Sequence, residues 1–104
     1  MKILYYVGKD VLRGTKLSKG TIDENADTLV INGNNEKIIL DGLEYAGTEK
    51  MPGGGTMIKI INNGQTIFLN VPRIFIDKGS GFCVSNYFKT MKLGKIINQR
   101  INSM

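Results

Sequence analysis

Histidine and tryptophan do not occur in this chain of 104 residues, and cysteine occurs once, at Cys83. A single thiol allows no disulfide within the chain and no thiolate cluster for zinc. Without histidine, Cys83 also lacks the usual base that activates a cysteine nucleophile, and we interpret it as a small buried core residue. The sequence therefore predicts no catalytic residue, no metal site and no cofactor, and we expect the protein not to be an enzyme.

Long apolar runs are missing as well. No stretch approaches the about 18 apolar residues that a membrane-spanning helix needs. The apolar run at residues 3–7 is too short for the core of a secretory signal peptide, so we expect a cytoplasmic protein. With 41% hydrophobic and 22% charged residues, the composition is that of a folded domain. The length predicts one domain over residues 1–104.

Acidic residues are absent from the last part of the chain. Residues 1–77 contain nine Lys or Arg and nine Asp or Glu, so their charges cancel. The five basic residues after Asp77 therefore carry the whole net charge of +5. A local excess of one sign favours association with a partner of the opposite sign.

The first ninety residues show the pattern of strands separated by turns. Residues 29–31 and 37–40 flank an Asn- and Gly-rich turn at 32–35, which indicates a hairpin. A stronger hairpin is predicted from residues 56–61, a turn at 62–64, and residues 65–71, where Ile67, Leu69 and Val71 share one face. Pro72 has no backbone N–H, so it should end that strand or mark an edge.

Further strands are expected at residues 3–7, 17–22, 43–50 and 73–76, with a polar turn at 23–27 and a loop at 78–81. Together these segments predict a mainly β barrel or sandwich of about seven antiparallel strands.

Near residue 85 the period of the apolar side chains changes from the two residues of a strand to the about 3.6 residues of a helix. The sequence there predicts an amphipathic helix over about 85–101, capped by Ser85 or Asn86. The expected buried arc consists of Tyr87, Met91, Leu93, Ile97 and Ile101. Gly94 lies inside this arc, and we expect it to permit close approach to a strand, at a cost of about 1 kcal/mol in helix propensity.

This layout resembles the pleckstrin-homology-like fold, with bacterial pleckstrin-homology-type and GRAM-type domains as the nearest relatives. The resemblance covers residues 13–101 in element order, and the segments that carry it are 19–22, 29–33, 55–60, 65–69 and 87–90. It implies a barrel or sandwich closed by the C-terminal helix. In that family a basic pair on the first hairpin holds lipid phosphates, which points here to Arg13, Lys16 and Lys19.

Lys89, Lys92 and Lys95 form a second basic group, because a spacing of three residues places them on one face of the predicted helix. Such a face can meet an anionic lipid, a nucleic acid or an acidic protein, or it can simply be solvated. The strands show no aromatic platform for stacking bases, which disfavours nucleic acid. We expect the apolar helix face to be used by the core, which disfavours insertion into a membrane.

Two loops resemble ligand sites only in part. Gly53, Gly54 and Gly55 can present consecutive N–H groups to an anion, but they lack the Lys-Ser/Thr and the helix of a phosphate-binding loop. We therefore interpret them as a flexible connection that can carry contacts. The acidic turn at 23–27 lacks the glycine and the closing Glu of a calcium loop.

The sequence therefore predicts a non-catalytic binding module whose partner is a protein, bound at an edge strand or in a groove beside the helix. The alternative is a binder of anionic lipid headgroups through a basic face, and nucleic-acid binding is the least favoured. Self-association is also conceivable through residues 3–7, if they form an unpaired sheet edge.

Overall fold

The computed structural model describes residues 1–12, 14–51, 55–72 and 86–102. Within these ranges the chain forms seven strands and one helix: β1 (Lys2–Val7), β2 (Ser18–Ile22), β3 (Val30–Gly33), β4 (Lys37–Ile39), β5 (Leu43–Lys50), β6 (Thr56–Asn62), β7 (Gln65–Asn70) and α1 (Tyr87–Asn102). Every described strand was expected from its sequence pattern. The strand expected at 73–76, the loop at 78–81 and Cys83 lie outside the described residues.

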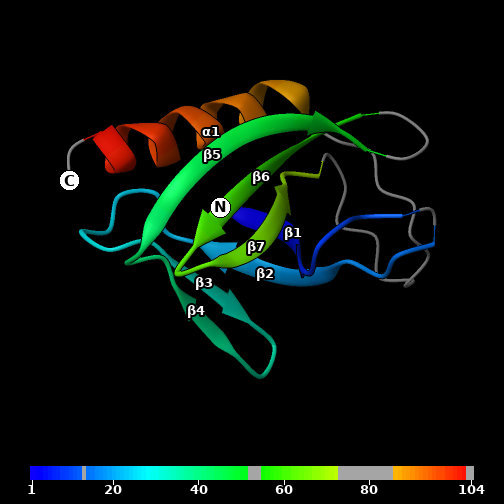
Figure 1. The fold of residues 1–104 in the computed structure, drawn as a ribbon, viewed down its shortest axis with the longest axis horizontal. Helices are drawn as coiled ribbons and strands as arrows, with labels where there is room; N and C mark the ends of the chain where they lie inside the picture. The colour runs from blue at the N-terminus through cyan, green and yellow to red at the C-terminus, as the bar shows by residue number, and fades with distance from the viewer. Residues whose placement is uncertain (13, 52–54, 73–85, 103–104) are drawn as a thin grey trace.

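All seven strands belong to one antiparallel sheet with the order β4-β3-β2-β1-β7-β6-β5. Two meanders, β1–β4 and β5–β7, are joined where β1 pairs with β7. The sheet curls into a half-barrel, and Figure 1 shows α1 lying along β5 and β6, away from β3 and β4. The structure thus confirms the predicted mainly β fold with a helix packed against the sheet.

The β6–β7 hairpin forms where the sequence predicted it, through a two-residue turn. Asn63 and Gly64 have φ angles of 51° and 78°, the left-handed conformation that a type I′ turn requires at both positions. Asparagine and glycine adopt this conformation at the lowest cost, and the turn fixes the register that pairs Asn62 with Gln65.

The main core fills the space between the curled sheet and the helix. Ile58, Ile60, Ile67 and Leu69 contribute from the central strands, and they are fully buried. The other face of β7 contributes Phe68 to a smaller cluster with Val11, Met51 and Met57. Because consecutive strand residues point to opposite faces, β7 is buried on both sides of the sheet.

Helix α1 is anchored at its start to the end of β7. The Oδ1 of Asn86 accepts a hydrogen bond from the N–H of Lys89 at 3.1 Å, which identifies Asn86 as the N-cap. The N–H of Asn86 donates to the Val71 carbonyl at 2.7 Å, and the Thr90 hydroxyl accepts from the Val71 N–H at 3.1 Å. These contacts determine where the first turns of the helix lie.

The buried face of α1 differs from the predicted arc at two positions. Leu93 and Ile97 are buried as expected, and Thr90 joins them. Tyr87 was expected in the buried arc but is 54% exposed. Gly94 is buried, yet a Cβ placed on it would lie 3.7 Å from Ile58, an ordinary contact distance. Gly94 therefore lies against Ile58 of β6, with room for one further methyl group.

β1 is not a sheet edge. It pairs with β2 on one side and β7 on the other, so residues 3–7 do not form the unpaired edge on which the conceivable self-association depended. The apolar, aromatic character of β1 reflects its place in the middle of the sheet. The two edge strands are β4, with three residues, and β5, with eight.

Candidate functional site

The three predicted helix lysines are all exposed, but the structure separates them into two groups. Lys89 and Lys92 line a cavity of about 450 Å³ at the start of α1, whereas Lys95 does not border it. The described lining also contains Lys2, so the cavity joins basic residues from β1 and α1. The remaining described lining residues are Met1, Glu24, Val71 and Pro72.

The sequence pattern gives no signal for Lys2 at this site, because Lys2 lies 87 positions before Lys89 in the chain. It is the first residue of β1, where alternation directs it away from the buried Ile3. The anchoring of α1 at Val71 brings the two segments together, since Val71 follows β7, the strand paired with β1. This pairing is a tertiary contact between distant segments, and no local pattern reports it.

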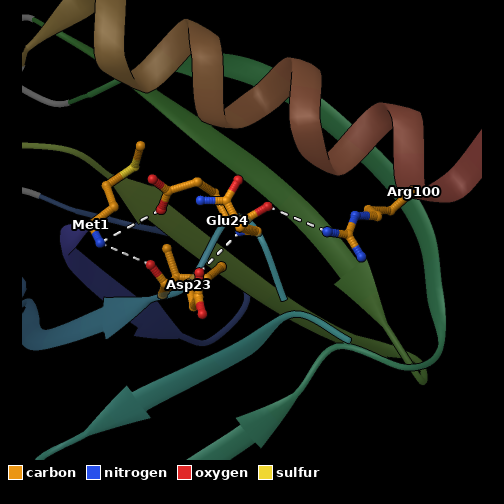
Figure 2. Close-up of polar contacts among 6 residues, drawn as sticks. Met1, Asp23, Glu24 and Arg100 are labelled. Atoms are coloured by element: carbon orange, nitrogen blue, oxygen red, sulfur yellow. Dashed lines mark hydrogen bonds and ion pairs between the residues drawn. The ribbon is translucent and has the colours of Figure 1, made fainter. Parts of the chain in front are cut away.

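A hydrogen-bonded corner closes one side of this region. The Met1 ammonium lies 3.6 Å from the Glu24 carboxylate and donates to the Ile22 carbonyl at 2.9 Å. Figure 2 shows this contact and the side chain of Arg100 reaching from α1 toward Glu24. The Arg100 guanidinium donates to the carbonyls of Glu24, Ala26 and Asp27. One side chain of the last helical turn thus binds the β2–β3 turn through its backbone.

Two carboxylates of the acidic turn at 23–27 have partners within the chain, and that of Glu24 is paired with the Met1 ammonium. The Asp23 carboxylate accepts the Asn25 N–H at 3.0 Å, which is an Asx turn. Across the described residues, no three His, Cys, Asp or Glu side chains gather in a way that could hold a metal ion.

The basic group suggested by the family resemblance lies elsewhere. Arg13 is outside the described residues, Lys16 is exposed before β2, and Lys19 lies within β2. Lys19 borders a separate cavity of about 350 Å³, lined also by Tyr5, Ser18, Asn34, Asn35 and Glu36. The structure therefore does not combine Lys16 and Lys19 with the helix lysines in one site.

Tyr5 lines this second cavity and connects β1 to the β3–β4 turn, a contact that we call the Tyr5 tie. Its ring extends from β1 across Gly20 and Gly33, where a Cβ would overlap the ring or its hydroxyl. The hydroxyl donates a hydrogen bond to the Glu36 carboxylate. Burial, then this hydrogen bond, then the charge of Glu36 raise the pKa of Tyr5 to about 12. The phenol therefore stays protonated, which suits a structural role.

The glycine-rich connection is described only at its end. Gly53 and Gly54 lie outside the described residues. Gly55 is exposed with a φ of 93°, and its carbonyl accepts the Met51 N–H at 3.0 Å. This hydrogen bond links the two ends of the connection between β5 and β6.

The long edge strand β5 pairs only with β6, and no described strand lies on its outer side. Tyr45 is about half exposed on this strand, and its hydroxyl lies against Gly47, where a Cβ would overlap it. Glu49 forms an ion pair with Lys59 of β6 at 3.5 Å. A groove of about 370 Å³ adjoins the start of β5, lined by Asp27, Thr28, Leu29, Leu40, Asp41, Leu43 and Arg100.

Two aromatic side chains are exposed at the start of α1. Tyr87 and Phe88 pack edge to face with ring centroids 5.6 Å apart, and Phe88 is 82% exposed. Phe88 precedes Lys92 by four positions, so the two lie on the same side of the helix. The sequence pattern placed Tyr87 in the core and gave no signal for this exposed pair.

Comparison with known proteins gave no match: no family model, no curated protein and no solved structure was found to be similar to this chain. In the part of the chain that the structure describes, no helix is both long and apolar enough to cross a membrane.

Proposed function

We propose that this chain is a non-catalytic module that binds a protein partner by adding the partner's strand to β5. The observation that carries the proposal is that β5, an eight-residue strand, lies at the edge of the sheet formed by the described strands and pairs there with β6 alone. Its outer N–H and C=O groups can form a second ladder with an extended peptide. The other edge strand, β4, has three residues and offers a much shorter ladder.

The groove beside β5 supports the same proposal. Its lining includes Leu43, the first residue of β5, together with Leu29, Leu40 and Arg100 of the helix. A peptide paired with β5 would place its end residues over this groove, where apolar walls can bury a side chain. The charged side chains in its lining, Asp27, Asp41 and Arg100, would orient polar groups of the peptide.

We further infer that the chain is a pleckstrin-homology-like domain, acting in the cytoplasm. The seven-stranded antiparallel sheet, its curl and the C-terminal helix packed against it support this assignment. A fold of this kind hosts many functions, so the edge strand and its groove, rather than the fold, carry the proposed activity.

Proline substitutions on β5 test the proposal. Neighbouring residues of an edge strand direct their N–H groups alternately inward and outward, so Thr48→Pro and Glu49→Pro differ in which ladder they interrupt. The variant whose replaced N–H points away from β6 interrupts no hydrogen bond within the sheet. It should therefore keep the far-ultraviolet circular dichroism of the wild type. It should also fail to retain partners that the immobilised wild-type chain captures from lysate.

The matched control is the double variant Lys89→Gln/Lys92→Gln, which changes the helix surface and leaves β5 intact. Strand addition would be contradicted if the partners bound both β5 variants as strongly as they bind the wild type. A second copy of this chain could also pair with β5, and sedimentation velocity over a range of concentrations would detect it.

A further inference from the structure

The cavity at the start of α1 concentrates positive charge. Lys2 comes from β1, and Lys89 and Lys92 come from consecutive turns of the helix. We propose that this cavity binds a phosphate-bearing anion, independently of the protein partner proposed for β5. The shared chemistry is a phosphate group held by lysine ammonium groups, which serve as compact point charges for such ligands.

Among the described residues, no ion pair balances the two positive charges that the helix brings to this cavity. Glu24 supplies the one carboxylate in the described lining, and the Met1 ammonium lies 3.6 Å from it. Lys89 and Lys92 have no ion-pair partner among the described residues. Bringing like charges into one cavity raises their mutual repulsion, and a bound anion would relieve it.

The start of the helix adds to the same field. The N-terminal end of a helix carries a partial positive charge, and acidic side chains usually stabilise it. The first turn of α1 has no acidic residue and contains Lys89, whose charge has the unfavourable sign for that position. A phosphate group in the cavity would interact favourably with the helix end and with Lys89 at once.

The size of the cavity limits the ligand. A volume of about 450 Å³ admits one or two phosphate groups with a small attached moiety. Val71 and Pro72 form an apolar wall, so the moiety beside the phosphate can be uncharged. Such a phosphate group can belong to a free metabolite or to a lipid headgroup.

Phe88 distinguishes the two sources. It is highly exposed beside Lys92 and does not line the cavity. An aromatic ring next to basic residues can enter the interfacial layer of an anionic membrane. A lipid ligand would therefore engage both Phe88 and the cavity, whereas a free phosphate compound would engage the cavity alone.

Titration calorimetry with inorganic pyrophosphate at constant ionic strength tests the cavity itself. Lys89→Gln and Lys92→Gln should each weaken pyrophosphate binding by about fivefold or more, because each removes one charge-assisted contact. Lys95→Gln is the matched control, since it removes the same charge from the same helix outside the cavity. Its affinity should stay within about twofold of the wild type.

Two results would overturn the proposal: no saturable binding of pyrophosphate, or an equal loss in all three variants, which would indicate only a general charge effect. Circular dichroism of each variant verifies that the helix is retained.

Sedimentation with vesicles then assigns the source. Phosphatidylcholine vesicles with and without phosphatidic acid are compared for the wild type, Lys92→Gln and Phe88→Ala. For a lipid ligand, binding requires phosphatidic acid and falls in both variants, while Phe88→Ala keeps its pyrophosphate affinity. If the ligand is a free phosphate compound, the protein binds pyrophosphate saturably, and its sedimentation with vesicles does not depend on phosphatidic acid. Vesicle binding that Lys92→Gln leaves unchanged would contradict the cavity as a lipid site.

Discussion

The hydroxyl of Tyr5 donates a hydrogen bond to the carboxylate of Glu36, which ties the middle strand of the sheet to the β3–β4 turn. The ring reaches Glu36 by crossing two other strands, at Gly20 of β2 and Gly33 of β3. These two glycines are cross-strand partners, so together they leave room for one aromatic ring on this face of the sheet.

The tie predicts a loss of stability at alkaline pH. The pKa of Tyr5 is raised from 10.0 to about 12 in the folded state, so the contribution of its hydrogen bond to stability is complete below pH 10. Between pH 10 and about 12 the unfolded chain releases the phenol proton first, and this contribution is lost as pH rises. Urea unfolding across this range should show a steeper decline for the wild type than for Tyr5→Phe. Parallel curves would contradict the tie.

Gly33 and Tyr5 should be energetically coupled. Gly33→Ala places a methyl group where the Tyr5 hydroxyl lies, so it should destabilise the wild type by about 1–3 kcal/mol. In the Tyr5→Phe background the hydroxyl is gone, and the cost of the same substitution should be smaller. A double-mutant cycle by chemical denaturation measures this difference, and strict additivity would show that the two residues do not compete for space.

Arg100→Ala should lower the free energy of unfolding by about 1–2 kcal/mol, because three backbone carbonyls of the β2–β3 turn lose a charged donor. Arg100→Lys should recover only part of this loss, since an ammonium cannot reproduce the fork of the guanidinium. Lys95→Ala, an exposed residue of the same helix, is the control and should cost less than about 0.5 kcal/mol. Equal effects at both positions would show that the loss comes from charge alone.

Gly94→Ala should stabilise the protein by about 0.5–1 kcal/mol. The new methyl group fits at ordinary contact distance from Ile58, and alanine is the better helix former. Gly64→Ala provides the opposite case, because its φ of 78° strains any residue with a Cβ, and about 1 kcal/mol should be lost. Thermal unfolding distinguishes the two signs. A destabilising Gly94→Ala would mean that the helix cannot accommodate the added methyl group.

Asn62 should be the most sensitive polar residue of the sheet. It is 3% exposed, its Oδ1 accepts the Gly42 N–H and its Nδ2 donates to the Ile39 carbonyl, both at 3.0 Å. Asn62→Asp removes the donor and places a negative charge beside a carbonyl, which should cost about 2–3 kcal/mol. Asn98→Asp, on the exposed face of the helix, should change stability little. Similar unfolding midpoints for both variants would contradict the role of Asn62.

The sequence predicted the strands and the helix because each is encoded by local periodicity. The alternation of Ile67 and Leu69 places them on one face, and Asn63 and Gly64 adopt the angles that their turn type demands. The N-cap at Asn86 was one of two predicted candidates, and its side-chain hydrogen bond identifies it.

The pairing of distant segments could not be predicted in the same way. Nothing in residues 2–7 indicates whether their neighbours are one strand or two, so the sequence alone allows β1 to be an edge. The same limit applies to the basic cavity, which requires Lys2 beside Lys89 and Lys92. Tyr87 fits the apolar helical period, but it lies in the first turn of the helix and remains half exposed.

The pairing of β1 with β7 also has a consequence for folding. Each meander contains only pairings between strands that follow one another, whereas Leu4 pairs with Asn70 and Val7 with Ile67. Pairing β1 with β7 closes the loop formed by all the residues between these two strands. This closure costs chain entropy before any contact compensates it. We therefore expect the β6–β7 hairpin to form early, and the β1–β7 junction to set the rate at which the native sheet appears.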